Sequence, residues 1–366
     1  MRTRISRLSV ATLIALSSFL LLRPAAGSGT PCRSVGLSTH PAWISSAVFV
    51  PALQKILLVD PLLNRLLLVS PSGQTTRLDN PATERAALPA LLAPLADGFL
   101  LKPVGPTLFF LDKALNLVSE SGLGRGAAGA RSALGPFYQW TVAGRTIIAY
   151  DSLRAANLPG GYELGFLRLP ATNPPGRPEM LLPFPNGDFY TLSYQYLAAL
   201  GPVAYFVAMD RTATIYRVPP GAAPVALTDA VPEGFREVPT LHTQTHGPSD
   251  TPALYAELER ATIPAGLYGG PDGFLYLLAR RPVAGGTEWS IFQIDAAGNK
   301  IRGLGHLRSA AKHLTVVPSP DAWYFIERGD IEPSGRQEIG SMIAVPSARL
   351  TGLTAAGADL CPELGR

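Results

Sequence analysis

The sequence predicts an all-β protein, a six-bladed β-propeller built from four-stranded antiparallel sheets, and three observations lead to this fold. Short apolar runs rich in Val, Ile, Leu, Phe and Tyr alternate with turns drawn from 36 glycines and 35 prolines, which is typical of many short strands. These runs recur in units whose period matches propeller blades. Cys32 and Cys361 lie near opposite ends of the chain, where a closed ring would bring the ends together.

Each unit consists of a strand, a tight turn, a second strand, a longer turn and a third strand, and a fourth strand usually follows a glycine-containing turn. The units are residues 47–79, 90–120, 137–169, 193–229, 265–305 and 313–350. One such sheet alone leaves both faces exposed, whereas a radial arrangement buries them against neighbouring sheets.

Two stretches resemble blades of known propellers. The sequence VDPLLNRLLLVSPSGQ, from Val59 to Gln74, resembles an NHL-type blade, and Ala204 to Asp229 is similar to the blades of TolB-like propellers. The segments GGPDGFLYLLA and PSPDAWYFIE carry the same strand–turn–strand pattern. The resemblance is one of pattern, covers most of the mature chain, and implies a six-bladed β-propeller without implying any catalytic residue.

Residues 1–27 have the features of a secretory signal peptide. Three arginines within the first seven residues precede an uncharged run, residues 8–22, that is short for a membrane span. Small residues up to Gly27 suit a signal-peptidase site. We therefore expect a mature propeller domain, residues 28–366, that works in the periplasm or outside the cell. The alternative is an uncleaved membrane anchor.

The charge balance bears on the class of partner. The chain carries 31 basic and 27 acidic residues, a net charge of +4. Arg2, Arg4, Arg7 and Arg23 account for this excess, so the mature chain is close to neutral. Nucleic acids and anionic membranes bind through a field of positive charge, and we expect neither as a partner. We expect a monomer that binds a protein or small-molecule ligand and carries no cofactor.

Cys32 and Cys361 are the two cysteines of the chain. In an oxidising compartment they predict a disulfide, which requires the two ends of the mature chain to meet. The alternative is a pair of unrelated thiols.

Residues 230–263 interrupt the regular spacing between the fourth and fifth units. Pro252, preceded by Ser, Asp and Thr, suits the first turn of a helix, so we expect a short helical insertion. It is either a functional loop or a surface decoration. His242 and His246 are candidates for a metal site because residues four apart can share a face. The spacing alone is insufficient to predict a metal.

A candidate ligand site comes from aromatic and glutamine residues where blades begin. Its residues are Tyr138, Gln139, Trp140, Tyr194, Gln195 and Tyr268. The first strand of a blade lines the central channel, so these side chains would form a pocket with polar groups at the channel mouth. The alternative is ordinary packing between blades.

Four aspartates, Asp60, Asp112, Asp151 and Asp210, are expected to end the second strand of a unit. A ring of metal ligands is conceivable, but Asp commonly caps a turn by accepting hydrogen bonds from backbone N–H groups. We therefore expect structural turn caps.

No motif in the sequence defines a reaction. There is no G-x-S-x-G and no C-x-x-C, and a G-x-G-x-x-G at residues 124–129 lacks the βαβ context that nucleotide binding requires. The first hypothesis is an exported binding module. The alternative is a propeller enzyme, either a metal-dependent hydrolase or lactonase or a sugar lyase, with its site at the channel mouth.

Overall fold

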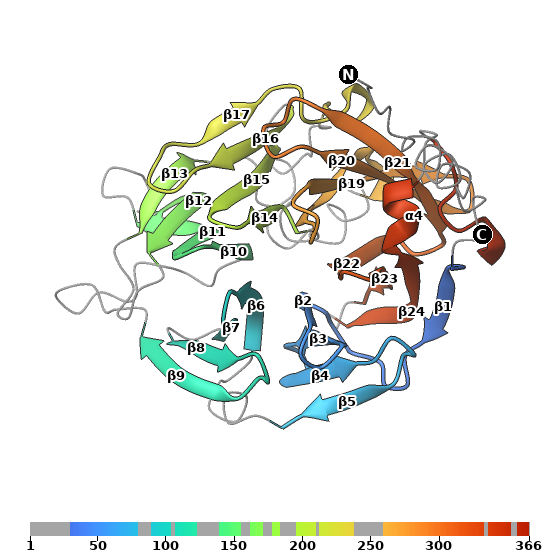
Figure 1. Ribbon diagram of the computed structural model, residues 1–366, viewed down its shortest axis with the longest axis horizontal. Helices are drawn as coiled ribbons and strands as arrows, with labels where there is room; N and C mark the ends of the chain where they lie inside the picture. Colours follow the sequence, from blue (N-terminus) through green and yellow to red (C-terminus); the bar gives the residue numbers. More distant parts are fainter. Residues whose placement is uncertain are drawn as a thin grey trace, which may run out of the picture.

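The computed structural model is a six-bladed β-propeller, which confirms the predicted ring of four-stranded antiparallel blades (Figure 1). The structure describes residues 30–79, 89–103, 107–122, 139–154, 162–170, 178–183, 195–209, 212–237, 259–332, 336–352 and 357–365. The sheets stand around a common axis, and in each blade the first strand is innermost.

The strands follow the chain blade by blade. Blade 1 consists of β2 Ser46–Val50, β3 Lys55–Asp60, β4 Arg65–Val69 and β5 Thr75–Leu78. Blade 2 consists of β6 Pro89–Leu95, β7 Gly98–Pro103, β8 Thr107–Asp112 and β9 Leu117–Gly122. Blade 3 consists of β10 Gln139–Ala143, β11 Thr146–Arg154, β12 Tyr162–Pro170 and β13 Glu179–Pro183.

Blades 4 to 6 complete the ring. Blade 4 consists of β14 Leu197–Leu200, β15 Val203–Met209, β16 Ala213–Val218 and β17 Val225–Leu227. Blade 5 consists of β18 Ile263–Gly269, β19 Leu275–Val283, β20 Gly286–Ile294 and β21 Ile301–Ser309. Blade 6 consists of β22 His313–Pro318, β23 Ala322–Ile331, β24 Gln337–Pro346 and β1 Arg33–Gly36. The short helices are η1 Glu233–Phe235, α4 Ser347–Gly352 and η3 Pro362–Leu364.

The hydrophobic core is a series of layers between neighbouring blades. Middle strands such as β3 are buried on both faces, which explains why they read as continuous apolar runs rather than alternating ones. Phe166 of blade 3 stacks on Phe206 of blade 4 with ring centroids 4.0 Å apart. Phe49 of blade 1 stacks on Tyr324 of blade 6 at 6.4 Å. Aromatic pairs of this kind add to the stabilisation from buried area.

Blade 6 is shared between the two ends of the chain. Strand β1 pairs antiparallel with β24, with Arg33 opposite Ala344 and Gly36 opposite Ser341 (Figure 1). The predicted unit 313–350 therefore supplies three strands, and the N-terminal strand supplies the fourth. In this closed ring, the backbone groups on the outer edge of β24 form hydrogen bonds with β1.

A disulfide between Cys32 and Cys361 fastens this closure, as the sequence predicts. Their Cα atoms lie 5.6 Å apart although they are separated by 329 residues. The C-terminal segment also runs along the outermost strand of blade 5, where Leu360 N donates to His306 O at 2.8 Å and His306 N donates to Ala358 O at 2.9 Å. The disulfide thus joins the outer rims of blades 5 and 6.

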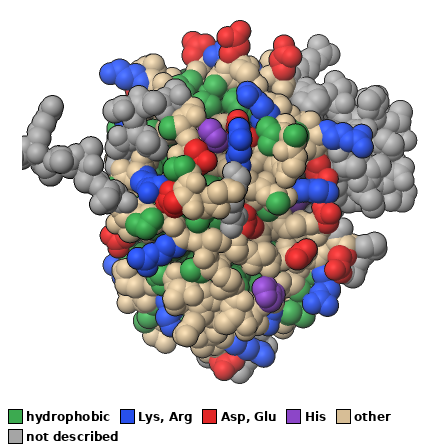
Figure 2. Space-filling model, turned by 90° about the vertical axis from the view of Figure 1, so that its right-hand side faces the viewer, with side chains coloured by type: hydrophobic (Ala, Val, Ile, Leu, Met, Phe, Trp, Pro, Cys, Tyr) green, Lys and Arg blue, Asp and Glu red, His purple; other side chains and the backbone are tan. Residues whose placement is uncertain are grey.

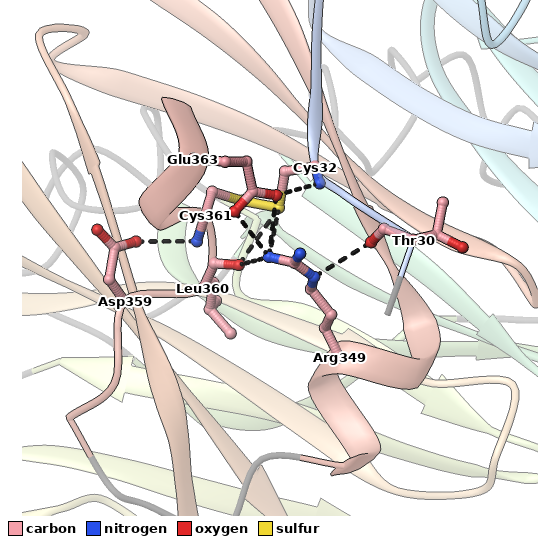
Figure 3. A network of polar contacts seen from close by, with 7 residues as sticks. All are labelled: Thr30, Cys32, Arg349, Asp359, Leu360, Cys361 and Glu363. Carbon is pink, nitrogen blue, oxygen red and sulfur yellow. Dashed lines mark hydrogen bonds and ion pairs between the residues drawn. A yellow bond between two sulfur atoms is a disulfide. The ribbon is translucent and has the colours of Figure 1, made fainter. Parts of the chain in front are cut away.

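Polar contacts surround the disulfide (Figure 3). Arg349 of α4 donates to the backbone oxygens of Thr30 at 3.2 Å and Leu360 at 2.8 Å, and its guanidinium pairs with Glu363 at 3.0 Å. Glu363 in turn accepts a hydrogen bond from Cys32 N. On the rim beside the chain ends, acidic and basic side chains are interspersed rather than gathered by sign (Figure 2).

The predicted third unit, 137–169, omitted its fourth strand, β13. The signal peptide, residues 1–27, and most of the predicted helical insertion, residues 238–258, lie outside the described residues. No helix in the described part of the chain is both long and apolar enough to cross a membrane.

The predicted equivalence of the strand-ending aspartates is wrong for Asp60 and Asp112. Asp60 ends β3, beside the start of β2, whereas Asp112 ends the third strand of blade 2 and pairs with Gly98 at the opposite end of that blade. Both accept backbone N–H groups of the turn that follows, as turn caps do: Asp60 from Leu63 at 3.3 Å and Asp112 from Ala114 at 2.8 Å. The structure describes neither Asp210 nor the side chain of Asp151.

Candidate functional site

A cavity of about 180 Å³ lies on the axis of the ring, where the innermost strands converge. Every blade contributes to its wall. Representative lining residues are Ser46 of β2, Leu92 of β6, Thr141 of β10, Gln195 before β14, Tyr268 of β18 and Thr315 of β22. A site shared by all blades depends on the whole ring being closed.

The structure places four of the six predicted ligand-site residues in the cavity wall: Gln139, Trp140, Gln195 and Tyr268. Tyr138 and Tyr194 lie outside the described residues. The four come from blades 3, 4 and 5 and are far apart in sequence, so the fold brings them together. Their role in binding a ligand remains a prediction.

Two further lining residues, Trp43 and Arg328, were missed by sequence reasoning. Trp43 lies three residues before β2, the same offset that Tyr194 has from β14; this repeated offset was a signal available in the sequence. Arg328 carried no such signal. It belongs to the second strand of blade 6 and reaches the cavity beside the innermost strand, where it pairs in register with His313.

The two glutamines have side-chain orientations set by backbone partners. Gln139 Oε1 accepts from Tyr196 N at 2.8 Å, and Gln195 Nε2 donates to Leu197 O at 3.2 Å. Because a backbone N–H only donates and a carbonyl only accepts, these contacts assign the oxygen and nitrogen ends of both amides. Gln139 is buried and bridges blades 3 and 4, whereas Gln195 is exposed.

Aromatic rings and aliphatic side chains such as Leu92 form the apolar part of the wall. Trp140 and Tyr268 are buried, and Trp43 is half-buried. They enter from blades 3, 5 and 1 respectively, so they approach the axis from different directions. Rings arranged in this way can contact a flat ligand on several sides.

A cluster of ionisable side chains lies between blades 5 and 6, beside the axial cavity. Glu259 accepts from Lys312 Nζ at 3.0 Å and lies 3.8 Å from His313 Nε2. Burial, together with the smaller effect of the nearby charges of Arg328 and Arg280, lowers the pKa of His313 to about 4 against the opposing effect of Glu259. His313 is therefore neutral at pH 7.

Glu259 remains ionised in this cluster. Burial alone would raise the pKa of Glu259, but its interactions with His313 and Lys312 outweigh burial and lower the pKa. Arg280 is buried, stacks over the Trp289 ring at 5.8 Å and donates to Glu259 O. Glu259, near the end of the 230–263 region, therefore contacts blade 5 through its backbone oxygen and blade 6 through its side chain.

The described wall of the axial cavity lacks the side chains that most often bind metal ions in proteins. Among the described lining residues there is no carboxylate and no imidazole, and no group of three His, Cys, Asp or Glu in the described part of the chain is arranged to hold a metal ion. The metal candidates His242 and His246 lie outside the described residues. The wall offers amides, hydroxyls, aromatic rings and one guanidinium.

A second cavity, of about 590 Å³, lies between blades 5 and 6 near the β19–β20 hairpin. Small residues such as Gly286, Ala310 and Gly340 form much of its wall. The carboxylate of Glu327 in this wall is buried and accepts hydrogen bonds from the hydroxyls of Ser309 and Ser341. This cavity is larger but has no aromatic ring among its described lining residues.

No protein-family model matches the chain, and no curated protein matches it either. A solved structure of a DUF4221-family protein from Bacteroides vulgatus has 9% identity and a TM-score of 0.53, covering 86% of this chain and 97% of that one. This likeness shows the propeller fold alone.

Two other solved propellers are similar at lower scores. Regucalcin from Agrobacterium tumefaciens, described as a calcium-binding protein, has 14% identity, a TM-score of 0.48, and coverage of 90% of this chain and 96% of that one. Virginiamycin B lyase from Staphylococcus aureus has 14% identity, a TM-score of 0.42, and coverage of 84% and 87%.

Proposed function

We propose that this protein is a binding protein that holds a small molecule in its axial cavity. The observation that carries the proposal is the convergence of Trp43, Trp140, Gln139, Gln195 and Tyr268 on one cavity from different blades. Small-molecule sites are typically concave and largely apolar, with a few polar groups that orient the ligand. The axial cavity is concave and has polar groups that can orient a ligand, although polar and apolar surface contribute about equally to its wall.

The proposed place of action is outside the cytoplasm, in the periplasm or the medium, and the proposed form is a monomer of the NHL-like or TolB-like type. The disulfide between Cys32 and Cys361 supports the location, because such bonds persist in oxidising compartments. The signal-like segment, residues 1–27, supports it independently.

Tryptophan fluorescence tests the binding proposal directly. The chain has four tryptophans; Trp43 and Trp140 line the axial cavity, whereas Trp289 and Trp323 are buried in the blades. A library of small aromatic compounds and sugars would first be screened for compounds that raise the unfolding temperature. We expect such compounds to change the emission of the wild type and of Trp289→Phe, but not of the double variant W43F/W140F.

Two results would contradict the proposal. One is a library in which no compound raises the unfolding temperature. The other is an emission change that persists in W43F/W140F, which would place the ligand elsewhere. The enzyme alternative, a metal-dependent hydrolase or lactonase or a sugar lyase with its site at the channel mouth, stays a prediction. The metal candidates His242 and His246 lie outside the described residues.

A further inference from the structure

We infer that the ligand of the axial cavity is a small organic anion, a carboxylate carried on an aromatic or similarly flat apolar body. The inference rests on the proposed binding function and adds the charge and the shape of the ligand. It is carried by Arg328 at one side of the cavity and by three aromatic rings on the others.

Arg328 is a buried cation in the cavity wall. The residue is 6% exposed, and its Nη1 donates to the neutral Oε1 of Gln337 at 3.3 Å. A guanidinium keeps its charge at any pH at which the protein is folded, and its planar array of donors matches the two oxygens of a carboxylate. Among the described residues of the wall, Arg328 is the charged one.

The charges around Arg328 are of both signs: Glu259 favours protonation of His313, whereas the nearby arginines oppose it. Arg280 of blade 5 lies close enough to act with Arg328 on His313, and both disfavour its protonation. The carboxylate of Glu259 is engaged by Lys312 at 3.0 Å. A further cation in this place is disfavoured, whereas an anion is favoured.

The neighbouring acid, Glu327, belongs to a different site. It lines the second cavity, where the hydroxyls of Ser309 and Ser341 donate to its carboxylate. Arg328 lines the axial cavity and Glu327 lines the second one, so the guanidinium and the carboxylate serve different cavities. The negative charge of Glu327 is thereby directed away from the axis.

The walls formed by blades 1, 3 and 5 provide a place for a flat apolar body. Trp43 of blade 1, Trp140 of blade 3 and Tyr268 of blade 5 contribute rings, and Arg328 enters from blade 6. A ring compound held among these side chains would present its carboxylate to the guanidinium. In a water-poor cavity such a charged hydrogen bond is stronger than at the surface. The volume of about 180 Å³ suits a small ring compound rather than a polymer.

Benzoate and benzamide form a matched pair of probes, because they share the ring and differ in charge. Calorimetric titration would compare both probes on the wild type, on Arg328→Gln and on Arg308→Gln. Arg308 is a control because its side chain is 54% exposed, pairs with Glu288 and lies outside the axial cavity. We expect the wild type and R308Q to bind benzoate at least about tenfold more tightly than benzamide, and R328Q to bind both alike.

The outcomes separate the two proposals. Equal affinity of the wild type for both probes would overturn the anion inference and leave the binding function standing. A benzoate preference that survives in R328Q would overturn the assignment to Arg328. Failure of both probes to bind the wild type would count against the anion inference and the aromatic cavity together. The comparison of benzoate with benzamide on the wild type needs no variant, so it tests the anion inference even if R328Q fails to fold.

Discussion

Gln139 Oε1 accepts a 2.8 Å hydrogen bond from the backbone N–H of Tyr196, and this contact joins blades 3 and 4 at the wall of the axial cavity. Tyr196 is fully buried, and its hydroxyl donates to Pro264 O of blade 5 at 3.1 Å. The two contacts link three consecutive blades through one residue. The innermost layer therefore holds the ring together as well as lining the cavity.

Replacing Gln139 by alanine should destabilise the protein by about 1–3 kcal/mol, because the buried N–H of Tyr196 would lose its acceptor. Gln139→Glu keeps an acceptor oxygen, so it should lower the free energy of unfolding by less than Gln139→Ala. Gln195→Ala is the matched control: Gln195 is exposed, so the expected loss is within about 0.5 kcal/mol. Urea unfolding monitored by circular dichroism measures all three. Equal losses for Q139A and Q195A would contradict this interpretation.

Removal of the disulfide by the double substitution C32A/C361A should lower the free energy of unfolding by about 2–5 kcal/mol. The bond closes a loop of 329 residues and holds β1 on β24. Unfolding of the variant, and of the wild type with and without a reductant, measures the effect. The reduced wild type should behave like the double variant, and an unchanged unfolding midpoint in both would show that the ring closes without the bond.

The Arg349–Glu363 pair beside the disulfide should contribute much less. Both side chains are partly exposed to solvent, and such pairs are worth about 0–1 kcal/mol. Glu363→Gln should therefore change the unfolding midpoint only slightly in the oxidised protein. A loss as large as that of C32A/C361A would mean that the polar contacts, rather than the covalent bond, hold the two ends.

Asp60→Ala should be strongly destabilising, by about 3–5 kcal/mol. The Asp60 side chain is fully buried, pairs with Arg65 Nε at 3.0 Å and accepts from the N–H groups of Ala42 and Leu63. Asp112→Ala is the control, since the Asp112 turn is exposed and its loss should be much smaller. Thermal or urea unfolding compares them, and similar losses would refute a difference based on burial.

Stability should fall as the pH drops from 6.5 towards 4, because of His313. Its pKa is lowered to about 4 in the folded protein by burial and then by Arg328 and Arg280, whereas in the unfolded chain it is about 6.5. Between these values the unfolded chain binds the additional proton, so the loss is up to about 1.4 kcal/mol per pH unit. The lowered pKa of Glu259 adds a loss only below its ordinary value of 4.5.

Urea unfolding at pH 7, 6 and 5 measures this slope. His313→Gln should flatten it, even if the variant is less stable at pH 7. His306→Gln is the control, because His306 is half-buried on the outer strand β21 and its replacement leaves His313 in place. An unchanged slope in H313Q would assign the pH dependence to other groups.

The candidate ligand site was only partly predictable. Gln139 and Gln195, each preceded by a tyrosine, lie where innermost strands begin, and the start of an innermost strand faces the axis in any propeller. Trp43 lies three residues before β2, as Tyr194 lies three residues before β14, so the same pattern could have predicted it. Arg328 was not, because it lies on a second strand and its approach to the cavity depends on the register between β22 and β23.

By itself, the sequence predicted the repeating strands, the blade number and the meeting of Cys32 with Cys361. These predictions follow from local apolar patterns, turn residues and the oxidising compartment that the predicted signal segment implies. Tertiary structure alone decided that β1 completes blade 6 and that Asp60 and Asp112 lie at opposite ends of their blades. It also decided that Arg328 faces the cavity and Glu327 does not. Pairing partners and facing directions depend on long-range register, which no local pattern encodes.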